Sequence, residues 1–594
     1  MNNSFIFRKN KKFSSFEKLL RIPFWLSSIS ILVFIYDFGF QRQPNELEYL
    51  FLVYIVTIIA GCFSLIGRYI LKATRPRLKS LPFDLILLVL LLCMIIQYCG
   101  ITSIELPIFL QNSFWLYFAT AAVFLREFSA LNLSFKRTIV NPAQLFIFSF
   151  LFIIVIGTFL LMLPNATYSR ISFLDALFTS TSAVCVTGLT VQDTATYFTE
   201  FGQIIIIFLI QIGGLGIMTF ASYFSYFFRG SSTYENQIML HEMTDTEKMA
   251  EVFGTLKRII LITFIVEATG ALIIYECVGK SLIMFQSDRI FFSIFHAISA
   301  FCNAGFSTLT NNLYDPALRY NYSLQMTIAL LVILGGIGFP ILFNLLRFIA
   351  LKLKFWFLKI IGKKPAKTAP WIINLNTRIV LNTTLLLLLV GTILFFVLEY
   401  HNTLYEHSFG GKLAISFFSA VTPRTAGFNV VNVSALHIST LLITILLMWI
   451  GASPASTGGG IKTSSIAVAW LNILSIIRGK QRVEAFKREI SPVSIHRAFA
   501  VIFLSIFVIF LSIFFVSIFE TDKGILNIAV ECISAFGTVG LSTGITLHLC
   551  GASKIVLILT MFVGRINMLT ILIAFFKKSS TWVGRYPSES ILIN

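Results

Sequence analysis

The stretch Ile298-Ser299-Ala300-Phe301-Cys302-Asn303-Ala304-Gly305-Phe306-Ser307-Thr308 recurs near the end of the chain as Ile533-Ser534-Ala535-Phe536, followed at the same offset by Gly540-Leu541-Ser542-Thr543. Two looser copies are Ser182-Ala183-Val184, which leads to Gly188-Leu189-Thr190, and Pro423-Arg424-Thr425-Ala426-Gly427-Phe428. The copies share polar residues, and each stands between two apolar runs, so chance similarity of apolar segments does not explain them. The sequence therefore predicts four internal repeats of one structural unit.

The apolar runs that flank the repeats predict a membrane protein. The chain has 594 residues, of which 57% are hydrophobic and 12% are charged, about half the charge density of an ordinary globular protein. Apolar runs of about 20 residues recur along it, and each is long enough to cross a bilayer. This composition excludes soluble enzymes and disordered scaffolds. The net charge of +19 comes from short Lys and Arg strips between the runs, which follows the positive-inside rule and does not indicate nucleic-acid binding.

The spans divide into an N-terminal group and a main body. Three or four spans are expected first, at 22–40, 50–70, 82–100 and 107–125. The main body has spans at 143–163, 202–222, 259–278, 323–345, 379–398, 441–474 with a break, 499–519 and 555–576. The basic strips at 72–79, 126–137, 347–367 and 478–488 alternate with weakly basic connections such as 164–169, 311–315 and 401–410. We therefore expect both termini in the cytoplasm.

Each repeat reads as a span, a short helix, a glycine-bearing loop and a second span. The short helices, such as 172–183 and 288–300, have about 12 residues and cross only half of the hydrocarbon core, so they must enter the membrane and turn back. The predicted fold is an all-α integral membrane protein, with four fused span, pore-helix, span repeats around one central pore and extra N-terminal transmembrane helices. The predicted segments are an N-terminal extension at 1–142, repeats at 143–258, 259–376, 377–493 and 494–577, an intramembrane loop at 451–463, and a tail at 578–594.

The four loops are candidate cation sites. Irregular backbone survives at membrane depth only where protein surrounds it or where it lines a wet path. Carbonyl oxygens of four converging loops can replace the hydration shell of a monovalent cation, and glycine supplies the φ > 0 conformations that point carbonyls inward. The loops contain no carboxylate, which favours a weakly hydrated ion. The alternative is that the glycines only permit tight turns or helix contacts. The candidate filter residues are Cys185, Val186, Thr187, Gly188, Cys302, Asn303, Ala304, Gly305, Thr425, Ala426, Gly427, Gly537, Thr538, Val539 and Gly540.

Three motifs resemble the Trk/Ktr/HKT superfamily of potassium-uptake proteins, and the Ktr branch most of all. They are Thr179-Ser180-Thr181-Ser182-Ala183-Val184-Cys185-Val186-Thr187-Gly188-Leu189-Thr190, Thr422-Pro423-Arg424-Thr425-Ala426-Gly427-Phe428 and Gly451-Ala452-Ser453-Pro454-Ala455-Ser456-Thr457-Gly458-Gly459-Gly460-Ile461-Lys462-Thr463. The resemblance covers residues 143–577. It implies potassium as the transported ion and no covalent cofactor. It also implies a homodimer in a bacterial inner membrane and a separate cytosolic regulatory ring that binds a nucleotide. A glycine at 188, where some plant members have serine, points to potassium over sodium.

Two arginines are candidate pore-associated charges. Arg424 resembles the family arginine beside the third loop, where its charge could repel surplus cations or hydrogen-bond loop carbonyls. Arg565 is an intramembrane charge and is therefore a functional candidate by default. The family often has Gly-Pro two residues after the Gly-Arg pair, whereas this chain has Asn567-Met568. The resemblance therefore predicts the charge of Arg565 but not the backbone geometry that follows it.

The segment 451–463 is the candidate gate. It holds four glycines, one proline and several small hydroxyl residues, and this composition cannot continue a stable helix. The family uses its matching loop as an intramembrane gate, with a plain helix kink as the alternative. Two further glycine clusters, at 211–216 and 335–340, do not fit a nucleotide-binding spacing and indicate close helix packing. The candidate gate residues are Gly458, Gly459, Gly460 and Lys462, of which Lys462 is expected to hold the loop near a carbonyl or carboxylate.

The leading hypothesis is a potassium-uptake pore through which ions move down their electrochemical gradient. The alternative is a Na⁺- or H⁺-coupled secondary transporter, which predicts inverted halves and an intramembrane carboxylate. An enzyme is the weakest hypothesis because the sequence has no HExxH motif for a catalytic metal. His296 is interpreted as a hydrogen-bonded packing residue. The cytoplasmic segments at 230–257, 352–367 and 478–488 are candidate docking surfaces for a regulatory partner.

Overall fold

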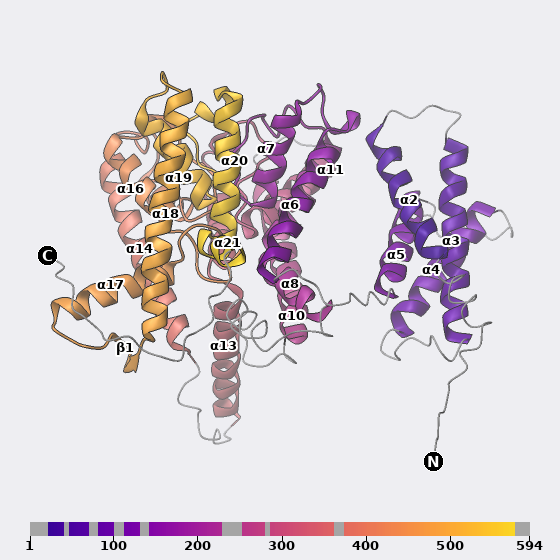
Figure 1. The fold of residues 1–594 in the computed structure, drawn as a ribbon, viewed down its shortest axis with the longest axis horizontal. Coiled ribbons are helices and arrows are strands. Elements are labelled where there is room, and N and C mark those ends of the chain that lie inside the picture. The colour runs from indigo at the N-terminus through magenta and orange to yellow at the C-terminus, as the bar shows by residue number, and fades with distance from the viewer. Residues whose placement is uncertain are drawn as a thin grey trace, which may run out of the picture. The chain divides into compact units, whose positions relative to one another are not determined.

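The computed structural model describes residues 22–40, 47–70, 81–99, 112–130, 142–227, 252–279, 286–361 and 373–575. The chain forms two compact units, one of Met1–Ser134 with Leu163–Asn165, and one of Phe135–Met162 with Ala166–Asn594. Both are built from helices (Figure 1), so the predicted all-helical membrane fold is confirmed. Predicted segments at 362–367, most of 230–257 and the tail at 578–594 lie outside the described residues.

The described part of the first unit is a bundle of four helices with an apolar centre. Its centre includes Tyr54, Leu91 and Leu116, which are almost fully buried. Two partly buried ion pairs, Arg68 with Glu127 and Arg126 with Asp84, join different helices of the bundle. The fourth helix begins later than the span expected at 107–125. The helices are α2 (Ile22–Gly39), α3 (Leu47–Ile70), α4 (Leu81–Cys99) and α5 (Phe114–Ala130).

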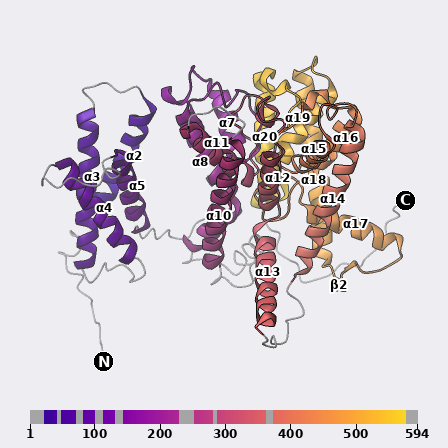
Figure 2. The ribbon, with the colours of Figure 1, turned by 180° about the vertical axis from the view of Figure 1, so that it is seen from behind.

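The second unit contains four span, short-helix, span repeats in chain order (Figure 2). The first consists of α6 (Pro142–Leu161), α7 (Phe173–Val184) and α8 (Glu200–Phe227), and the second of α10 (Val252–Val278), α11 (Gln286–Phe301), α12 (Tyr322–Gly336) and α13 (Phe339–Ile360). The third consists of α14 (Leu375–Glu399), α15 (Phe409–Val421), α16 (Ile438–Trp449) and α17 (Thr463–Ile477), and the fourth of α18 (Pro492–Phe519), α19 (Ile525–Gly537), α20 (Gly551–Ile566) and α21 (Met568–Phe575). In the described connections, short 3-10 helices lie at Pro164–Ala166, Asn312–Tyr314, Val433–Ala435 and Ile545–His548.

The short helices start and stop for local reasons. Ser172 caps α7 by accepting a hydrogen bond from the Asp175 backbone N–H, and Ser408 caps α15 in the same way through Gly411. α7 has 12 residues and α15 and α19 have 13 each, so each covers about half of the hydrocarbon core. Each ends where the chain enters the glycine-bearing loop of its repeat.

Two spans that the sequence predicts as continuous, 323–345 and 555–576, are bent instead. α12 and α13 meet at 105°, and α20 and α21 meet at 85°. Gly338 has φ +91° at the first break and Asn567 has φ +75° at the second, and both conformations end a right-handed helix. The Asn567 side chain supports the second turn, because its Oδ1 accepts a hydrogen bond from the Leu569 N–H at 3.2 Å, and the chain turns here without a Gly-Pro pair. α13 extends away from the other helices of its unit (Figures 1 and 2).

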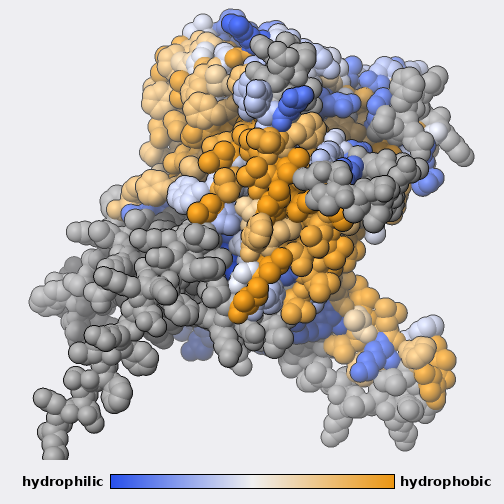
Figure 3. Space-filling model, turned by 90° about the vertical axis from the view of Figure 1, so that its right-hand side faces the viewer, coloured by the Kyte–Doolittle hydropathy of each residue, from blue (hydrophilic) through white to orange (hydrophobic). Residues whose placement is uncertain are grey.

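The outer surface of the helices is apolar. Among the described residues, six helices are long and apolar enough to cross a membrane, or eight if each bent pair is counted as one span. Phe503 and Phe510 on α18, for example, are 71% and 62% exposed. The face in Figure 3 carries a broad hydrophobic area, as expected for helices that contact lipid.

A small hairpin is the one β-sheet among the described residues. β1 (Glu484–Ala485) pairs antiparallel with β2 (Arg488–Glu489). Phe486 and Lys487 form the turn with φ of 50° and 64°, the conformation of a tight two-residue hairpin. The hairpin overlaps the basic strip 478–488 at residues 484–488 and thus gives part of that candidate docking surface a defined shape.

Glycines of the second spans lie against the last carbonyls of the short helices. A Cβ on Gly213 would stand 2.0 Å from Val184 O, and one on Gly335 or Gly564 would stand 1.9 Å from Phe301 O or Phe536 O. The glycine clusters at 211–216 and 335–340 therefore serve close packing, as the sequence indicates.

We expect Gly335→Ala to destabilise the fold by about 3 kcal/mol or more, because the backbone carbonyl that meets the new methyl group cannot rotate away. Thermal unfolding in detergent and the yield of monodisperse protein measure the effect. Gly410→Ala is the matched control, since a Cβ there meets no atom within 4 Å. Equal unfolding midpoints for the two variants would contradict the packing role of Gly335.

Candidate ion-binding site

The four repeated glycines lie side by side in a closed ring. A Cβ on Gly188 would stand 2.3 Å from Ala304 O of the second loop, and one on Gly305 would stand 2.7 Å from Ala426 O of the third. The same relation links Gly427 to Val539 O at 2.3 Å and Gly540 back to Thr187 O at 2.2 Å. The loops are thus ordered one to four around the ring, with the second opposite the fourth.

Each loop has two residues in the left-handed region of backbone space. One is the repeated glycine, with φ between 71° and 91°, and the other stands two positions before it. The residue between them does not have a positive φ. This alternation turns successive carbonyls toward the same side, which a ring of carbonyl ligands requires. The earlier left-handed residues are Val186 (57°), Asn303 (61°), Thr425 (72°) and Thr538 (48°).

Sequence reasoning assigned positive φ only to the glycines and missed these four residues. A β-branched side chain such as that of Val186 rarely adopts this conformation, which costs about 1–3 kcal/mol. The signal that could have found them is their fixed position two residues before each repeated glycine. Packing has to hold this backbone in place, and Val186 and Thr425 are fully buried.

Hydroxyl groups at the ends of the short helices fix the loop backbone. The Gly188 N–H donates to Ser182 Oγ at 3.1 Å, and the Gly540 N–H donates to Ser534 Oγ at 3.0 Å. In the second repeat Ser299 Oγ donates to Phe306 O at 2.8 Å. These serines belong to the repeated motif, yet sequence reasoning gave them no role, because their partners are defined only once the loop is folded.

The ring opens on one side into a vestibule, a cavity of about 330 Å³ whose walls include all four repeated glycines. Its lining is mostly hydroxyl, amide and apolar groups, with Asp193 as the acidic residue among the described lining residues. Asn312 Nδ2 donates to Gly305 O at 3.2 Å and so fixes one carbonyl at the rim. Its lining also includes Thr190, Ser307, Asn429, Ser542 and Thr546.

The candidate gate loop lies against the opposite side of the ring. α16 ends at Trp449 and α17 begins at Thr463, so the helix break expected in this span is present. The Gly459 N–H donates to Thr538 Oγ1 at 3.0 Å, and a Cβ on Gly458 would stand 2.1 Å from Thr425 Oγ1. Both threonines precede their loop glycines by two positions. The vestibule, by contrast, is lined by the loop glycines and by residues that follow them. The gate loop and the vestibule therefore lie on opposite sides of the ring.

Two cationic side chains hold the gate loop through its carbonyls. Lys462 Nζ donates to Gly458 O at 2.6 Å and to Gly459 O at 3.3 Å. Arg565 donates to Thr457 O in the same loop and to Gly213 O at 2.6 Å. The guanidinium of Arg565 therefore links the gate loop to the second span of the first repeat, and the side chain is only 3% exposed.

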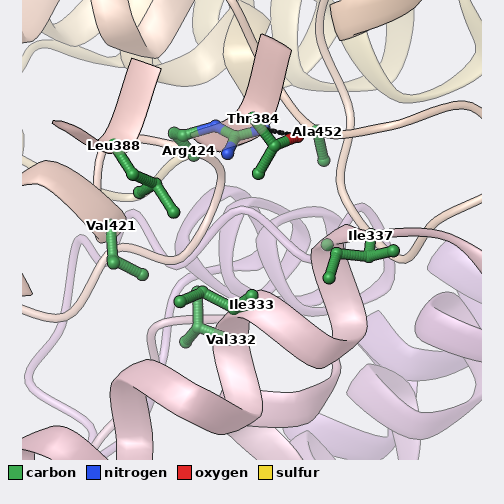
Figure 4. A pocket seen from close by; sticks show the side chains of 9 residues that line it. Val332, Ile333, Ile337, Thr384, Leu388, Val421, Arg424 and Ala452 are labelled. Atoms are coloured by element: carbon green, nitrogen blue, oxygen red, sulfur yellow. Dashed lines mark hydrogen bonds between the residues drawn. The ribbon is translucent and has the colours of Figure 1, made fainter. Parts of the chain in front are cut away.

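Arg424 lies apart from the carbonyl ring, in a cavity behind the third loop (Figure 4). Its guanidinium donates to Thr384 Oγ1 of α14 at 3.4 Å, and its Nε has no hydrogen-bond partner. No hydrogen bond from Arg424 to a loop carbonyl is present among the described residues, so the expected contact with loop carbonyls is not observed. The cavity has a volume of only about 20 Å³ and is lined by Val332, Ile333, Gly336, Ile337, Thr384, Leu388, Val421 and Ala452.

The structure brings the predicted filter residues together and places the predicted gate residues beneath them. Cys185 and Cys302 stand at the start of their loops and are fully buried, and the short helices α7, α11, α15 and α19 all end at the loops. The C-terminal ends of these four short helices, which carry the negative end of the helix dipole, therefore face the region of the ring and favour a cation there. Among the described residues, no three His, Cys, Asp or Glu side chains are grouped so that they could hold a metal ion.

Known proteins share this sequence pattern and fold. The profile of the TrkH family, described as a cation transport protein, matches residues 109–583. The chain is 38% identical to Ktr system potassium uptake protein B of Bacillus subtilis, over 76% of this chain and 96% of that protein. It is 35% identical to the potassium/sodium uptake protein NtpJ of Enterococcus hirae, over 77% of this chain and 98% of that protein.

The fold is similar to the crystal structure of the potassium transporter TrkH from Vibrio parahaemolyticus. The TM-score is 0.58 at 17% sequence identity, and the match covers 84% of this chain and 97% of that one. The family consists of transporters rather than enzymes. The chain belongs to the TrkH family of cation transport proteins.

Proposed function

We propose that this protein is a potassium-selective membrane subunit that mediates K⁺ uptake through the ring of four loops. The observation that carries the proposal is the closed ring of loop glycines, in which each loop alternates left-handed and other residues and contains no carboxylate. Such a ring offers uncharged carbonyl oxygens, the ligands that can replace the hydration shell of a weakly hydrated cation. The printed names of the relatives, potassium uptake and potassium/sodium uptake proteins, support this ion.

The path of the ion follows from the contacts of the ring. A cation enters the vestibule, loses water to the carbonyls of residues 185–188, 302–305, 425–427 and 537–540, and meets the gate loop on the far side. Because Gly458 and Gly459 lie directly against Thr425 and Thr538, the gate loop closes the path where it stands. Lys462 and Arg565 hold it there through backbone carbonyls, so withdrawal of the loop requires these hydrogen bonds to break.

The coupled secondary transporter stays as the second candidate because of Glu267. This carboxylate lies on α10, is 5% exposed, and accepts a hydrogen bond from Gln211 Nε2 at 3.1 Å. Sequence reasoning found no intramembrane carboxylate that could act in coupling. The fold buries Glu267 beside Cys302, whose thiol lies 3.8 Å from Glu267 Oε1. A buried carboxylate of this kind is what H⁺ or Na⁺ coupling requires.

The setting that we propose is a bacterial inner membrane, with both termini cytoplasmic, a homodimer, and a separate cytosolic subunit that binds the nucleotide. The basic strip 478–488, with its hairpin, is a candidate docking surface, since its charges are exposed. α13 is a second candidate, because it extends from its unit and carries Lys352 and Lys354.

Ion flux into proteoliposomes that contain the full-length protein tests the proposal. We expect K⁺ to enter down its gradient without an imposed Na⁺ or H⁺ gradient, with a reversal potential that follows K⁺ rather than Na⁺. Uptake that requires a Na⁺ or H⁺ gradient would favour the coupled transporter. Equal permeability to K⁺ and Na⁺ would refute the potassium filter.

A further inference from the structure

Two titratable residues occupy the same position in the short helices of opposite repeats. His296 on α11 and Glu531 on α19 each stand two residues before the shared Ile-Ser-Ala-Phe motif, and both are almost fully buried. Repeats one and three have Thr179 and Phe418 at the corresponding positions. Because the loops are ordered one to four around the ring, the two titratable residues stand behind opposite loops.

Both side chains bind the serine that follows the loop glycine by two positions. His296 Nε2 lies 2.9 Å from Ser307 Oγ, and Ser542 Oγ donates to Glu531 Oε1 at 2.6 Å. Each contact joins the short helix to the segment that leaves the ring. The same position therefore supports the outer end of the loop in both repeats. The supporting group is an imidazole in the second repeat and a carboxylate in the fourth.

Glu531 makes further hydrogen bonds, and in all of them it accepts. The Thr543 N–H donates to Oε1 at 3.0 Å, and Thr546 Oγ1 donates to Oε2 at 2.6 Å. Ser542 itself accepts from the Gly544 N–H at 2.8 Å, which leaves its proton for the carboxylate. An ionised carboxylate can only accept hydrogen bonds, so these contacts fit the ionised form. No described basic side chain forms an ion pair with Glu531, so protein cations do not neutralise its charge.

The partners of Glu531 form part of the vestibule wall. Ser542, Gly544 and Thr546 line the vestibule together with Gly540, while Glu531 is 1% exposed. The carboxylate therefore stands one hydrogen bond behind the surface that an entering cation meets. A buried charge acts over a longer range than an exposed one because water screens it less. The vestibule's own lining contributes Asp193 as its acidic residue among those described.

We propose that Glu531 is a positioning residue that determines cation affinity and specificity at the fourth loop. Its carboxylate holds the segment after Gly540 in place and attracts cations toward the ring, while His296 holds the opposite loop without that negative charge. This inference rests on the proposed function of the ring as a potassium filter. The ring carbonyls bind the ion, and Glu531 acts on it through the loop and through its field.

Two substitutions separate the position of Glu531 from its charge. Glu531→Gln keeps the shape and an acceptor for Ser542 and Thr543, so we expect the K⁺ over Na⁺ permeability ratio to stay within twofold while the half-saturating K⁺ concentration rises at least threefold. Glu531→Ala removes the support as well, and we expect the permeability ratio to fall at least fivefold. His296→Gln, which can still bind Ser307, is expected to change the half-saturating concentration less than twofold.

The measurement is K⁺ and Na⁺ flux in proteoliposomes with the full-length protein. Glu489→Gln is the matched control, because it removes an exposed carboxylate that pairs with Arg482, and neither residue lines the vestibule. A half-saturating concentration for Glu531→Gln equal to that of the wild type overturns the inference, and so does an unchanged permeability ratio for a folded Glu531→Ala. If Glu531→Ala does not fold, Glu531→Gln decides alone. A wild-type protein without K⁺ preference refutes the filter itself.

Discussion

Gly188→Ser is expected to lower the K⁺ over Na⁺ permeability ratio at least tenfold, which corresponds to about 1.4 kcal/mol of lost discrimination. Gly188 has φ +88°, and its Cβ would stand 2.3 Å from Ala304 O of the neighbouring loop. The serine must therefore shift the backbone of two loops at once, and the carbonyls that replace the water of the ion move with it. Reversal potentials in K⁺ and Na⁺ gradients measure the ratio.

The matched control for Gly188→Ser is Gly410→Ser. Gly410 lies in the first turn of α15, is exposed, and has no atom within 4 Å of an added Cβ. We expect the control to keep the wild-type permeability ratio. If Gly188→Ser also kept it, the ring would not be the selectivity filter.

Deletion of Gly458–Gly460 is expected to raise K⁺ conductance at least fivefold in the absence of any regulatory partner. These residues occupy the space directly beneath the ring, and the deletion also removes the carbonyls that Lys462 holds. Flux into proteoliposomes, or current through a planar bilayer, measures the effect.

The permeability ratio is the internal control for the deletion. The loops of the ring are fixed by hydrogen bonds to their own short helices, such as Gly188 N–H to Ser182 Oγ, so we expect selectivity to survive. A rise in conductance with wild-type selectivity identifies a gate. An unchanged conductance would favour the simple helix kink, and a rise with lost selectivity would indicate collapse of the filter.

Much of the architecture could be predicted because it follows from repetition and from length. The repeated motif located all four loops, and helices of about 12 residues cannot cross a bilayer. The gate segment could be found because its composition cannot form a helix. These features depend on local sequence, so no knowledge of distant contacts was needed.

The rest depends on contacts between distant residues, which no single stretch of sequence reveals. The bend at Gly338 occurs where its Cβ position meets Pro454 O of the gate loop, more than a hundred residues later. Thr425 and Thr538 adopt positive φ because loop packing holds them, not because of their own preference. Arg424 could be singled out by its charge, but the sequence did not indicate Thr384 as its partner.

The four quarters of the ring belong to a single polypeptide, and this has a consequence for stoichiometry. An assembly of four identical subunits would repeat every neighbour of the ion fourfold, so one arginine behind a loop would become a square of four positive charges. Here Arg424, His296 and Glu531 each occur once around the ring. Gene duplication followed by divergence could therefore adjust the electrostatics of this pathway in steps of one elementary charge, which rotational symmetry forbids.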